Sequence, residues 1–366
     1  LDEFQWLANY RQELVSTLKM VWERYFSRSP GRTLILCGSI ASFMTTKVIQ
    51  SSAFYGRTDL VIHLRGFRLA ETARLLKGRG FTEVLDAQCF TGGVPKYLEL
   101  LSRASSISAG METEAFRPQG FFVDEYERIF VSHFGKNAEY QRLVRSLADQ
   151  PYGMLRRDLA AAAKVDEGGM LSQRLYDLEA AGFISSHRPF DKEDSSRLIR
   201  YYLSDPWMSF YHNFLRTRLK QIHAGGRPTM FASIRQTGAF RSWLGRAFEL
   251  VCMRHDSELA HILGFGGIDY DCGPWFRAPR KGLPGVQIDL AFNRKDHVIT
   301  LCEMKRQTAP LARSVIAEVE RKAEVLRAEY HRLTIQPVMV IDGPVSKEVK
   351  ASGYFYRIVQ AEELLG

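Results

Sequence analysis

Apolar positions are interleaved with polar ones along residues 287–292 and again along residues 298–305, and five polar residues separate the two runs. A period of two predicts two β-strands joined by a turn. Side chains two residues apart share one face of a strand, so Glu303 and Lys305 are expected side by side. If the turn centres on the middle of its polar residues, Asp289 lies almost opposite Glu303. The pattern therefore predicts that two carboxylates and one ammonium group converge beside apolar strands.

Charged groups in such a position are costly to bury unless a partner satisfies them. A divalent metal ion and a phosphodiester would do so. Asp289 and Glu303 would hold Mg²⁺ or Mn²⁺, and Lys305 would orient or polarise the attacking water. The arrangement resembles the D…(D/E)xK signature of the restriction-endonuclease-like nuclease superfamily. The alternative is a surface hairpin that carries an Asp and a Glu-x-Lys without any such function.

A helix is predicted upstream of the hairpin. Apolar residues recur at helical spacing from Phe240 to Val251, and Glu249 lies within this run. Nucleases of the superfamily often take a further acidic metal ligand from a helix in this place, so the resemblance implies that role for Glu249. The alternative is an exposed helical carboxylate.

The remaining pattern of residues 206–366 predicts a small α/β unit. An aromatic helix over residues 205–215, expected to pack in a core that bridges two domains, comes first. A charged helix over residues 309–330, a buried strand over 334–341 and a last strand over 354–358 follow the hairpin. Helix, hairpin, helix and strand form the core order of the nuclease-like fold that the resemblance implies.

The pattern of residues 131–205 predicts a winged helix-turn-helix, with three helices followed by a two-stranded hairpin. In a DNA reader the third helix, here residues 169–181, enters the major groove. The side chains expected to point outward from it are Ser172, Gln173, Arg174 and Tyr176. The unit carries 11 basic and 11 acidic side chains, and its loop over residues 189–197 is mixed in charge. The alternative is a winged helix that only packs against a neighbouring domain.

Short motifs follow one another in residues 1–130. They are the acidic pair in DEFQWL, a strand predicted to be buried over residues 32–39 and ending in GS, then YGR and TGGVPKYL. In this order they resemble the latter part of the archaeal and prokaryotic AAA+ (STAND-like) ATPase family whose members carry a C-terminal nuclease-like domain. The resemblance implies a partial AAA+ module with a helical lid.

The resemblance also implies roles in ATP binding and hydrolysis. Asp2 would hold the Mg²⁺ of the nucleotide and Glu3 would orient the hydrolytic water, as in a Walker B motif. Ser39 would be sensor 1, Arg57 an arginine finger and Pro95 the turn of the lid. The alternatives are a structural loop arginine at position 57 and a simple helix start at Pro95.

No G-x-x-x-x-G-K-[ST] motif occurs in the chain. The phosphate-binding loop is therefore expected before Leu1, in a part of the protein that this sequence does not include. ATP would be a cofactor of the longer protein, and we expect it to bind this chain poorly.

Composition narrows the class of protein further. The net charge is +9, and residues 206–366 contribute +7 of it through 23 Lys or Arg and 16 Asp or Glu. This surplus favours a polyanionic partner, nucleic acid and in particular DNA. Five cysteines without CxxC spacing indicate reduced thiols and a cytoplasmic protein. No apolar run of about 18 residues predicts a membrane span.

Together these patterns predict an α/β and α+β multidomain protein. Its parts would be a partial AAA+ module with lid (residues 1–130), a winged helix (131–205) and a restriction-endonuclease-like domain (206–366). Three functions are compatible with this organisation. They are an ATP-regulated, metal-dependent nuclease, a non-catalytic ATP-gated switch that only binds DNA or protein, and a DNA-binding regulator that acts through the winged helix. A homo-oligomer is compatible with each of them.

Overall fold

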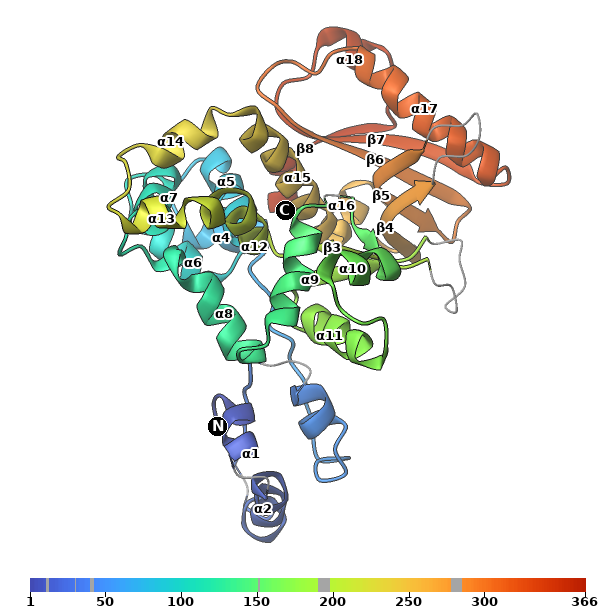
Figure 1. Ribbon diagram of the computed structural model, residues 1–366. Helices are drawn as coiled ribbons and strands as arrows, with labels where there is room; N and C mark the ends of the chain where they lie inside the picture. The colour runs from blue at the N-terminus through green and yellow to red at the C-terminus, as the bar shows by residue number, and fades with distance from the viewer. Residues whose placement is uncertain (11–12, 30, 40–42, 151, 190–197, 278–284) are drawn as a thin grey trace.

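The computed structural model of the chain describes all residues except 11–12, 30, 40–42, 151, 190–197 and 278–284. Figure 1 shows a small N-terminal lobe, a helical body above it, and a second body built on a five-stranded sheet. Helices and two sheets both occur, which confirms the mixed α and β class expected from the sequence.

The N-terminal lobe is mostly helical. It comprises α1 (Phe4–Tyr10), α2 (Leu14–Val21) and the π-helical turns η1 (Trp22–Phe26) and η2 (Met44–Ile49). Its core is small, with four buried apolar residues: Phe4, Ala8, Val48 and Phe54. An extended segment, residues 57–68, connects the lobe to the helical body (Figure 1).

The buried strand predicted over residues 32–39 is wrong for this chain. Residues 32–38 are extended without a strand assignment, and Ile35 is 64% exposed. Leu1 N donates to Ile35 O and Cys37 N donates to Leu1 O, each at 2.8 Å, which is the pattern of two parallel strands. Among the described residues the segment has this neighbour on one side only, and it therefore stays exposed.

The helical body is assembled from two stretches of the chain. The first contributes α4 (Leu69–Leu75), α5 (Phe81–Thr91), α6 (Pro95–Ser102), α7 (Ile107–Phe116) and α8 (Glu125–Phe134). The second contributes α12 (Pro206–Phe210), η4 (Tyr211–Leu215), α13 (Leu219–His223) and α14 (Met230–Arg235).

Aromatic side chains join these two stretches into one core. Phe90 of α5 is fully buried, and its ring lies 5.5 Å from Phe210 and 5.8 Å from Trp243, on which it stacks. Trp207 and Phe214 are also buried, which confirms the core role predicted for the aromatic helix. The same core extends onto one face of the five-stranded sheet.

The three helices and the hairpin predicted for residues 131–205 form between the two bodies. This unit consists of α9 (Ala138–Ala148), β1 (Met154–Leu155), α10 (Arg156–Ala163), α11 (Gly169–Ala180), β2 (Ile184–His187) and β3 (Arg200–Leu203), with strand order β1-β3-β2. Gly182 ends the third helix with φ of 78°, a conformation that favours glycine. Residues 190–197 of the expected wing lie outside the described residues.

One side chain of the presumed recognition helix does not point outward. Arg174 forms an ion pair with Glu139 of α9, and its side chain is only 12% exposed. The apolar stripe of α11 fixes which face is buried, but the helix packs close enough to α9 for Glu139 to reach the flank of that stripe. Ser172, Gln173 and Tyr176 are exposed as expected.

The five-stranded sheet has the order β4-β5-β6-β7-β8. The strands are β4 (Tyr270–Arg277), β5 (Val286–Arg294), β6 (Val298–Arg306), β7 (Thr334–Asp342) and β8 (Arg357–Gln360). β4, β5 and β6 are antiparallel neighbours, whereas β6, β7 and β8 run parallel. The last strand begins three residues later than predicted, because residues 354–356 lead into the ladder without forming it.

Helices cover both faces of this sheet (Figure 1). α15 (Gly238–Arg254) packs on the face turned toward the helical body, where Phe248 and Cys252 join Leu290 and Cys302 in one core. α17 (Ser314–Glu329), which connects β6 to β7, covers the opposite face through Val319 and its apolar neighbours. Polar groups on the strands are therefore enclosed between helices, so each of them needs a hydrogen-bond or ion-pair partner within the protein.

Candidate active site

The predicted hairpin forms, and the candidate site lies where its two strands part. The β5–β6 ladder runs from Asn293 opposite Ile299 to Leu290 opposite Cys302 and ends there. In this register the next two residues are Asp289 and Glu303. β5 continues beside β4 from this point, whereas β6 continues beside β7. The two carboxylates thus flank a fork between strands.

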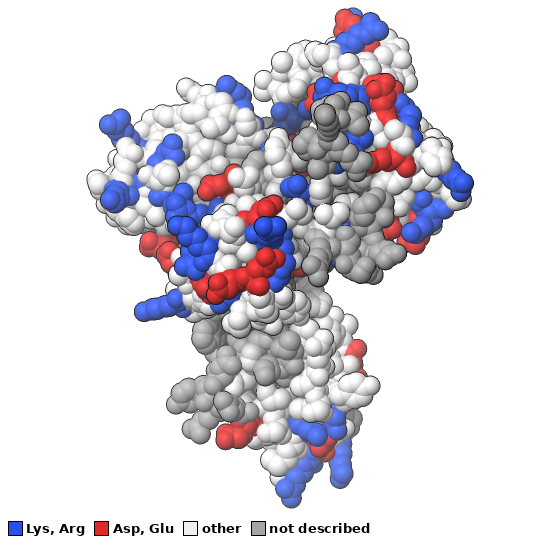
Figure 2. All heavy atoms as spheres, turned by 45° about the vertical axis from the view of Figure 1, so that its right-hand side comes forward, with Lys and Arg blue, Asp and Glu red and all other residues white. Residues whose placement is uncertain are grey.

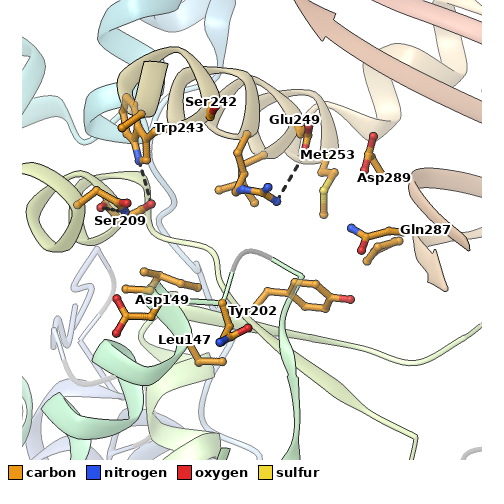
Figure 3. Close-up of a pocket in the computed structure, with 18 residues that line it drawn as sticks. Leu147, Asp149, Tyr202, Ser209, Ser242, Trp243, Glu249, Met253, Gln287 and Asp289 are labelled. Carbon is orange, nitrogen blue, oxygen red and sulfur yellow. Dashed lines mark hydrogen bonds and ion pairs between the residues drawn. The ribbon is translucent and has the colours of Figure 1, made fainter. Parts of the chain in front are cut away.

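At this fork, a β-bulge in β5 changes the direction in which its side chains point. Ala291 is opposite Gly273, but Ile288 is opposite Trp275, so β5 has one residue more than β4 over this step. The extra residue falls at Asp289 or Leu290. A bulge changes the direction of side chains, and bulges are common next to active sites. Asp289 is accordingly one of the residues that line a cavity under α15, as Figure 3 shows.

Glu249 reaches the same place from α15. Thr237 caps this helix by accepting a hydrogen bond from Phe240 N at 3.1 Å, and buried Phe248 and Val251 fix its rotation. Glu249 lies between these two anchors and faces the cavity next to Asp289 (Figure 3). The helix predicted from apolar spacing therefore brings a third carboxylate to the fork.

The charges of Glu249 and Asp289 are only partly compensated by nearby cations. Burial, and then the negative charge of Asp289, raise the pKa of Glu249 to about 8. Burial, and then the charge of Glu303, raise the pKa of Asp289 to about 6. Arg246 offsets this in part from 4.0 Å away from Glu249. Because the charge of Asp289 raises the pKa of Glu249, a cation beside the two carboxylates would be favoured.

Glu303 has the opposite environment, because a lysine holds each of its carboxylate oxygens. Lys305 Nζ lies 2.9 Å from one oxygen and Lys322 Nζ lies 2.6 Å from the other. The Glu303 side chain is 1% exposed. Burial alone would raise its pKa, but the two ammonium groups hold the pKa of Glu303 below its ordinary value.

Two residues of this cluster escaped the sequence-based prediction. Lys322 and Glu318 both come from α17, and Glu318 accepts a hydrogen bond from Lys305 Nζ at 3.4 Å. They are four residues apart and so share one face of the helix. That spacing was visible in the sequence, but many charged residues of α17 have it, and only packing decides which face meets β6.

The residues fit a divalent metal in part. Among the described residues no group of three or more His, Cys, Asp or Glu side chains is arranged to hold a metal ion. Glu249 and Asp289 remain as two adjacent carboxylates, a sufficient protein contribution for Mg²⁺, which keeps several waters. Glu303 would complete the predicted set of ligands only if the metal ion replaced a lysine on one of its carboxylate oxygens.

The cavity beside Glu249 and Asp289 has a volume of about 390 Å³. It lies between α15, the end of α9, β3 and the start of β5, so the winged helix and the sheet both contribute to its walls (Figure 3). Tyr202 faces α15 across it, and Gln287 and Met253 flank the carboxylates. Its size is in the range of small-ligand sites.

The N-terminal candidates lie together in part. Ser39 Oγ donates to Glu3 Oε2 at 3.1 Å, and Gln5 Nε2 donates to Ser39 Oγ at 2.9 Å and also to Glu3. Asp2 Oδ1 accepts a hydrogen bond from Glu3 N at 2.9 Å. The acidic pair and the presumed sensor residue are thus neighbours in space.

The two other N-terminal candidates have different surroundings. Arg57 forms an ion pair with Glu23 of η1 and donates to Tyr55 O at 3.0 Å. Pro95 is the first residue of α6, directly after the tight turn at Gly92 and Gly93, and it is exposed. Neither has a recorded hydrogen bond or ion pair with Glu3 or Ser39 in the part of the chain that the structure describes.

Charge on the surface is mixed. In the view of Figure 2, Lys and Arg side chains alternate with Asp and Glu over the sheet body and the winged helix, and no broad field of one sign is seen on this face. The described residues also contain no helix of the length and apolar character that crossing a membrane requires.

Comparison with known proteins gives distant similarities. No family model matches the chain. The chain is 22% identical over 309 residues to the uncharacterized protein MJECL04 of Methanocaldococcus jannaschii, a match that covers 83% of this chain and 66% of that protein. The chain thus spans slightly less than two thirds of the length of this relative. The crystal structure of protein VC1899 from Vibrio cholerae aligns over 67% of this chain and 53% of that chain, at 13% identity and a TM-score of 0.26, which is too low to carry an argument.

Proposed function

We propose that the fork between β5 and β6 is the active site of a metal-dependent phosphodiesterase that acts on nucleic acid, in particular DNA, within an ATPase of the AAA+ class. The observation that carries this proposal is the partly compensated pair of Glu249 and Asp289, whose pKa values are both raised, next to the Glu303–Lys305 pair. A cation and a phosphate would together satisfy all four groups. A divalent ion bound there would stabilise the charge that develops on the phosphate.

The chain's own residues would divide the work as follows. Glu249 from helix α15 and Asp289 from strand β5 would hold Mg²⁺ or Mn²⁺. Lys305 would orient the attacking water, and its contacts with Glu303 and Glu318 hold the side chain over the fork. These contacts, acting against burial, raise the pKa of Lys305, so it would stay protonated and act as a charge, not as a base.

The order of elements is a second support. α15, the meander β4–β5–β6, the crossover helix α17 and the parallel strand β7 follow one another as the resemblance to restriction-endonuclease-like proteins requires. An Asp and a Glu-x-Lys on neighbouring strands, with a further acidic residue on the preceding helix, are also what the resemblance implies. The uneven charge of residues 206–366 agrees with a polyanionic substrate.

The ATPase part of the proposal rests on the N-terminal lobe. Glu3 and Ser39 are hydrogen-bonded at 3.1 Å, and the segments that carry them run parallel. Leu60, Ile62 and Leu64 of the extended segment are 73%, 67% and 92% exposed, a composition and exposure that call for neighbouring strands. We infer that these segments belong to a larger nucleotide-binding sheet, with Asp2 on the metal of the nucleotide.

A non-catalytic, ATP-gated switch is the second candidate. The observation in its favour is that both oxygens of Glu303 are engaged by lysines, so the site of the isolated chain is blocked in part. In that case the fork and the winged helix would bind DNA or protein without cleaving it. Exposed Ser172, Gln173 and Tyr176 would provide the DNA contacts of α11.

Plasmid nicking in Mg²⁺ or Mn²⁺ separates the two candidates. Asp289→Ala and Lys305→Ala should each lower the rate at least 100-fold, because each removes a group that the reaction needs. A matched pair of controls lies on the same sheet: Asp271 and Lys295 form an exposed ion pair at 3.2 Å, and Asp271→Ala and Lys295→Ala should retain activity. Absence of metal-dependent cleavage, or cleavage that survives both site substitutions, would leave the switch as the better proposal.

A further inference from the structure

The D…(D/E)xK pattern accounts for one lysine at Glu303, and the structure contains two. Lys322 comes from the middle of α17, and its Nζ is the nearer of the two ammonium groups at 2.6 Å. Its side chain is 14% exposed, compared with 31% for Lys305. A largely buried lysine at this place is therefore a feature of the site that the motif does not explain.

Packing alone does not require a cation at position 322. The neighbouring residues Val319, Ala323 and Leu326 bury the apolar side of α17 on the sheet, and an apolar side chain of similar length would continue that surface. Burying an ammonium group costs free energy unless a counter-charge repays it. Glu303 is the recorded ion-pair partner of Lys322 among the described residues, so the contribution of Lys322 is tied to that carboxylate.

The two lysines are not equivalent. Lys305 is shared between Glu303 and Glu318, and it stays fixed to α17 through Glu318 even when its contact with Glu303 is lost. Lys322 holds the other oxygen of Glu303. A divalent cation on that oxygen would be repelled by the ammonium group, so the cation and Lys322 would exclude one another.

We propose that Lys322 is a positioning residue that competes with the divalent cation for the carboxylate of Glu303 and thereby sets how tightly the site binds metal. This inference rests on the proposed metal site at the fork. In the metal-free protein Lys322 neutralises Glu303 and keeps β6 and α17 together. The flexible four-carbon stem lets its ammonium group leave toward the solvent-accessible side when Glu303 becomes a ligand.

If Lys322 had only a structural role, removing it would weaken the binding of Mn²⁺, whereas removing a competitor would strengthen it. Calorimetric titration with Mn²⁺ distinguishes these two roles. Lys322→Met keeps an apolar side chain of similar length and removes the charge. This variant should bind Mn²⁺ at least about tenfold more tightly than the unchanged protein. Glu303→Gln should bind Mn²⁺ more weakly. Arg327→Met, which removes an exposed ion pair with Glu320 on the same helix, should leave the affinity unchanged.

Thermal melting in EDTA shows whether the substitutions change the stability of the metal-free fold. Lys322→Met should melt at a lower temperature than the unchanged protein. The double substitution Lys322→Met, Glu303→Gln should recover part of the loss, because the buried negative charge that lost one of its two lysines is then gone. Tighter binding of Mn²⁺ by Lys322→Met, even if the unchanged protein binds none, supports the inference. Equal or weaker binding by Lys322→Met overturns the inference and leaves the metal site standing, whereas no binding by any of the proteins overturns both.

Discussion

The two clusters of candidate residues differ in how completely the described residues enclose them. At the fork, Glu303 is 1% exposed and lies between two helices and a sheet, with lysines on both oxygens. In the N-terminal lobe, Glu3 and Ser39 are joined to each other but exposed, and the segments around them have neighbours on one side only. The comparison teaches that the carboxylate at the fork has its charge partners within the described residues, whereas the N-terminal cluster is held together by hydrogen bonds at an exposed surface.

The cores show the same contrast. A single aromatic and aliphatic core runs from α5 through α15 to the sheet, so the helical body and the sheet body are packed together. Among the described residues, the core of the lobe contains four buried apolar residues and is separate from it. We therefore expect the lobe to unfold independently, and at lower denaturant concentration than the rest of the chain.

The largest effect on stability is expected at Arg306, the last residue of β6. Its guanidinium is 8% exposed and pairs with Asp86 of α5 at 2.7 Å and with Asp342 of β7 at 2.8 Å. Arg306→Met would leave two carboxylates without this partner and should lower the free energy of unfolding by roughly 3–5 kcal/mol. Denaturant melts would measure it. A loss below about 1 kcal/mol would show that the helical and sheet bodies are not coupled as tightly as their shared core indicates.

A smaller, pH-dependent effect is expected at Glu249. Its pKa rises from the ordinary 4.5 to about 8 in the folded protein, so its protonated form favours folding at low pH. This contribution is lost progressively as pH rises from about 4.5 to about 8, because over that range the unfolded chain has released the proton that the folded carboxyl group, buried beside Asp289, still holds. Glu249→Gln should therefore raise the melting temperature by roughly 2–6 °C at pH 8.5.

The same substitution should have little effect at pH 5, where the wild-type side chain is already protonated. Differential scanning at both pH values tests the sign. Equal shifts at the two pH values would mean that Glu249 is not held beside a second carboxylate, and the proposed metal pair would lose its support.

The smallest effect is expected in the lobe. Arg57 and Glu23 form an ion pair with side chains 33% and 45% exposed. Pairs of this kind contribute about 0–1 kcal/mol, so Arg57→Met should shift the unfolding of the lobe by no more than that. Melts followed at a probe in the lobe would measure it. A larger loss of unfolding free energy would indicate that Arg57 makes a stronger stabilising contact than its ion pair with Glu23.

The sequence predicted the elements of the sheet body well because they rest on local signals. Alternation of residues and a polar turn specify the β5–β6 hairpin, and apolar spacing specifies α15 and places Glu249 on it. The register that brings Asp289 level with Glu303 follows from the length of the turn alone.

What escaped prediction depends on packing between distant segments. Lys322 meets Glu303 only because α17 crosses over the sheet in one rotational setting, and Arg174 is turned inward by Glu139 of another helix. The bulge at Asp289 depends on how β4 pairs with β5. The strand predicted over residues 32–39 has the right composition, but burial requires neighbours on both sides, and the described residues supply one.

The central claim, that Glu249 and Asp289 form a metal site at the fork, is tested most directly by anomalous diffraction from crystals soaked in Mn²⁺. The account predicts a peak bonded to the carboxylates of both residues, lost in Asp289→Ala. A well-ordered fork without a peak at Mn²⁺ concentrations that support cleavage, or a peak held by other residues alone, would contradict it.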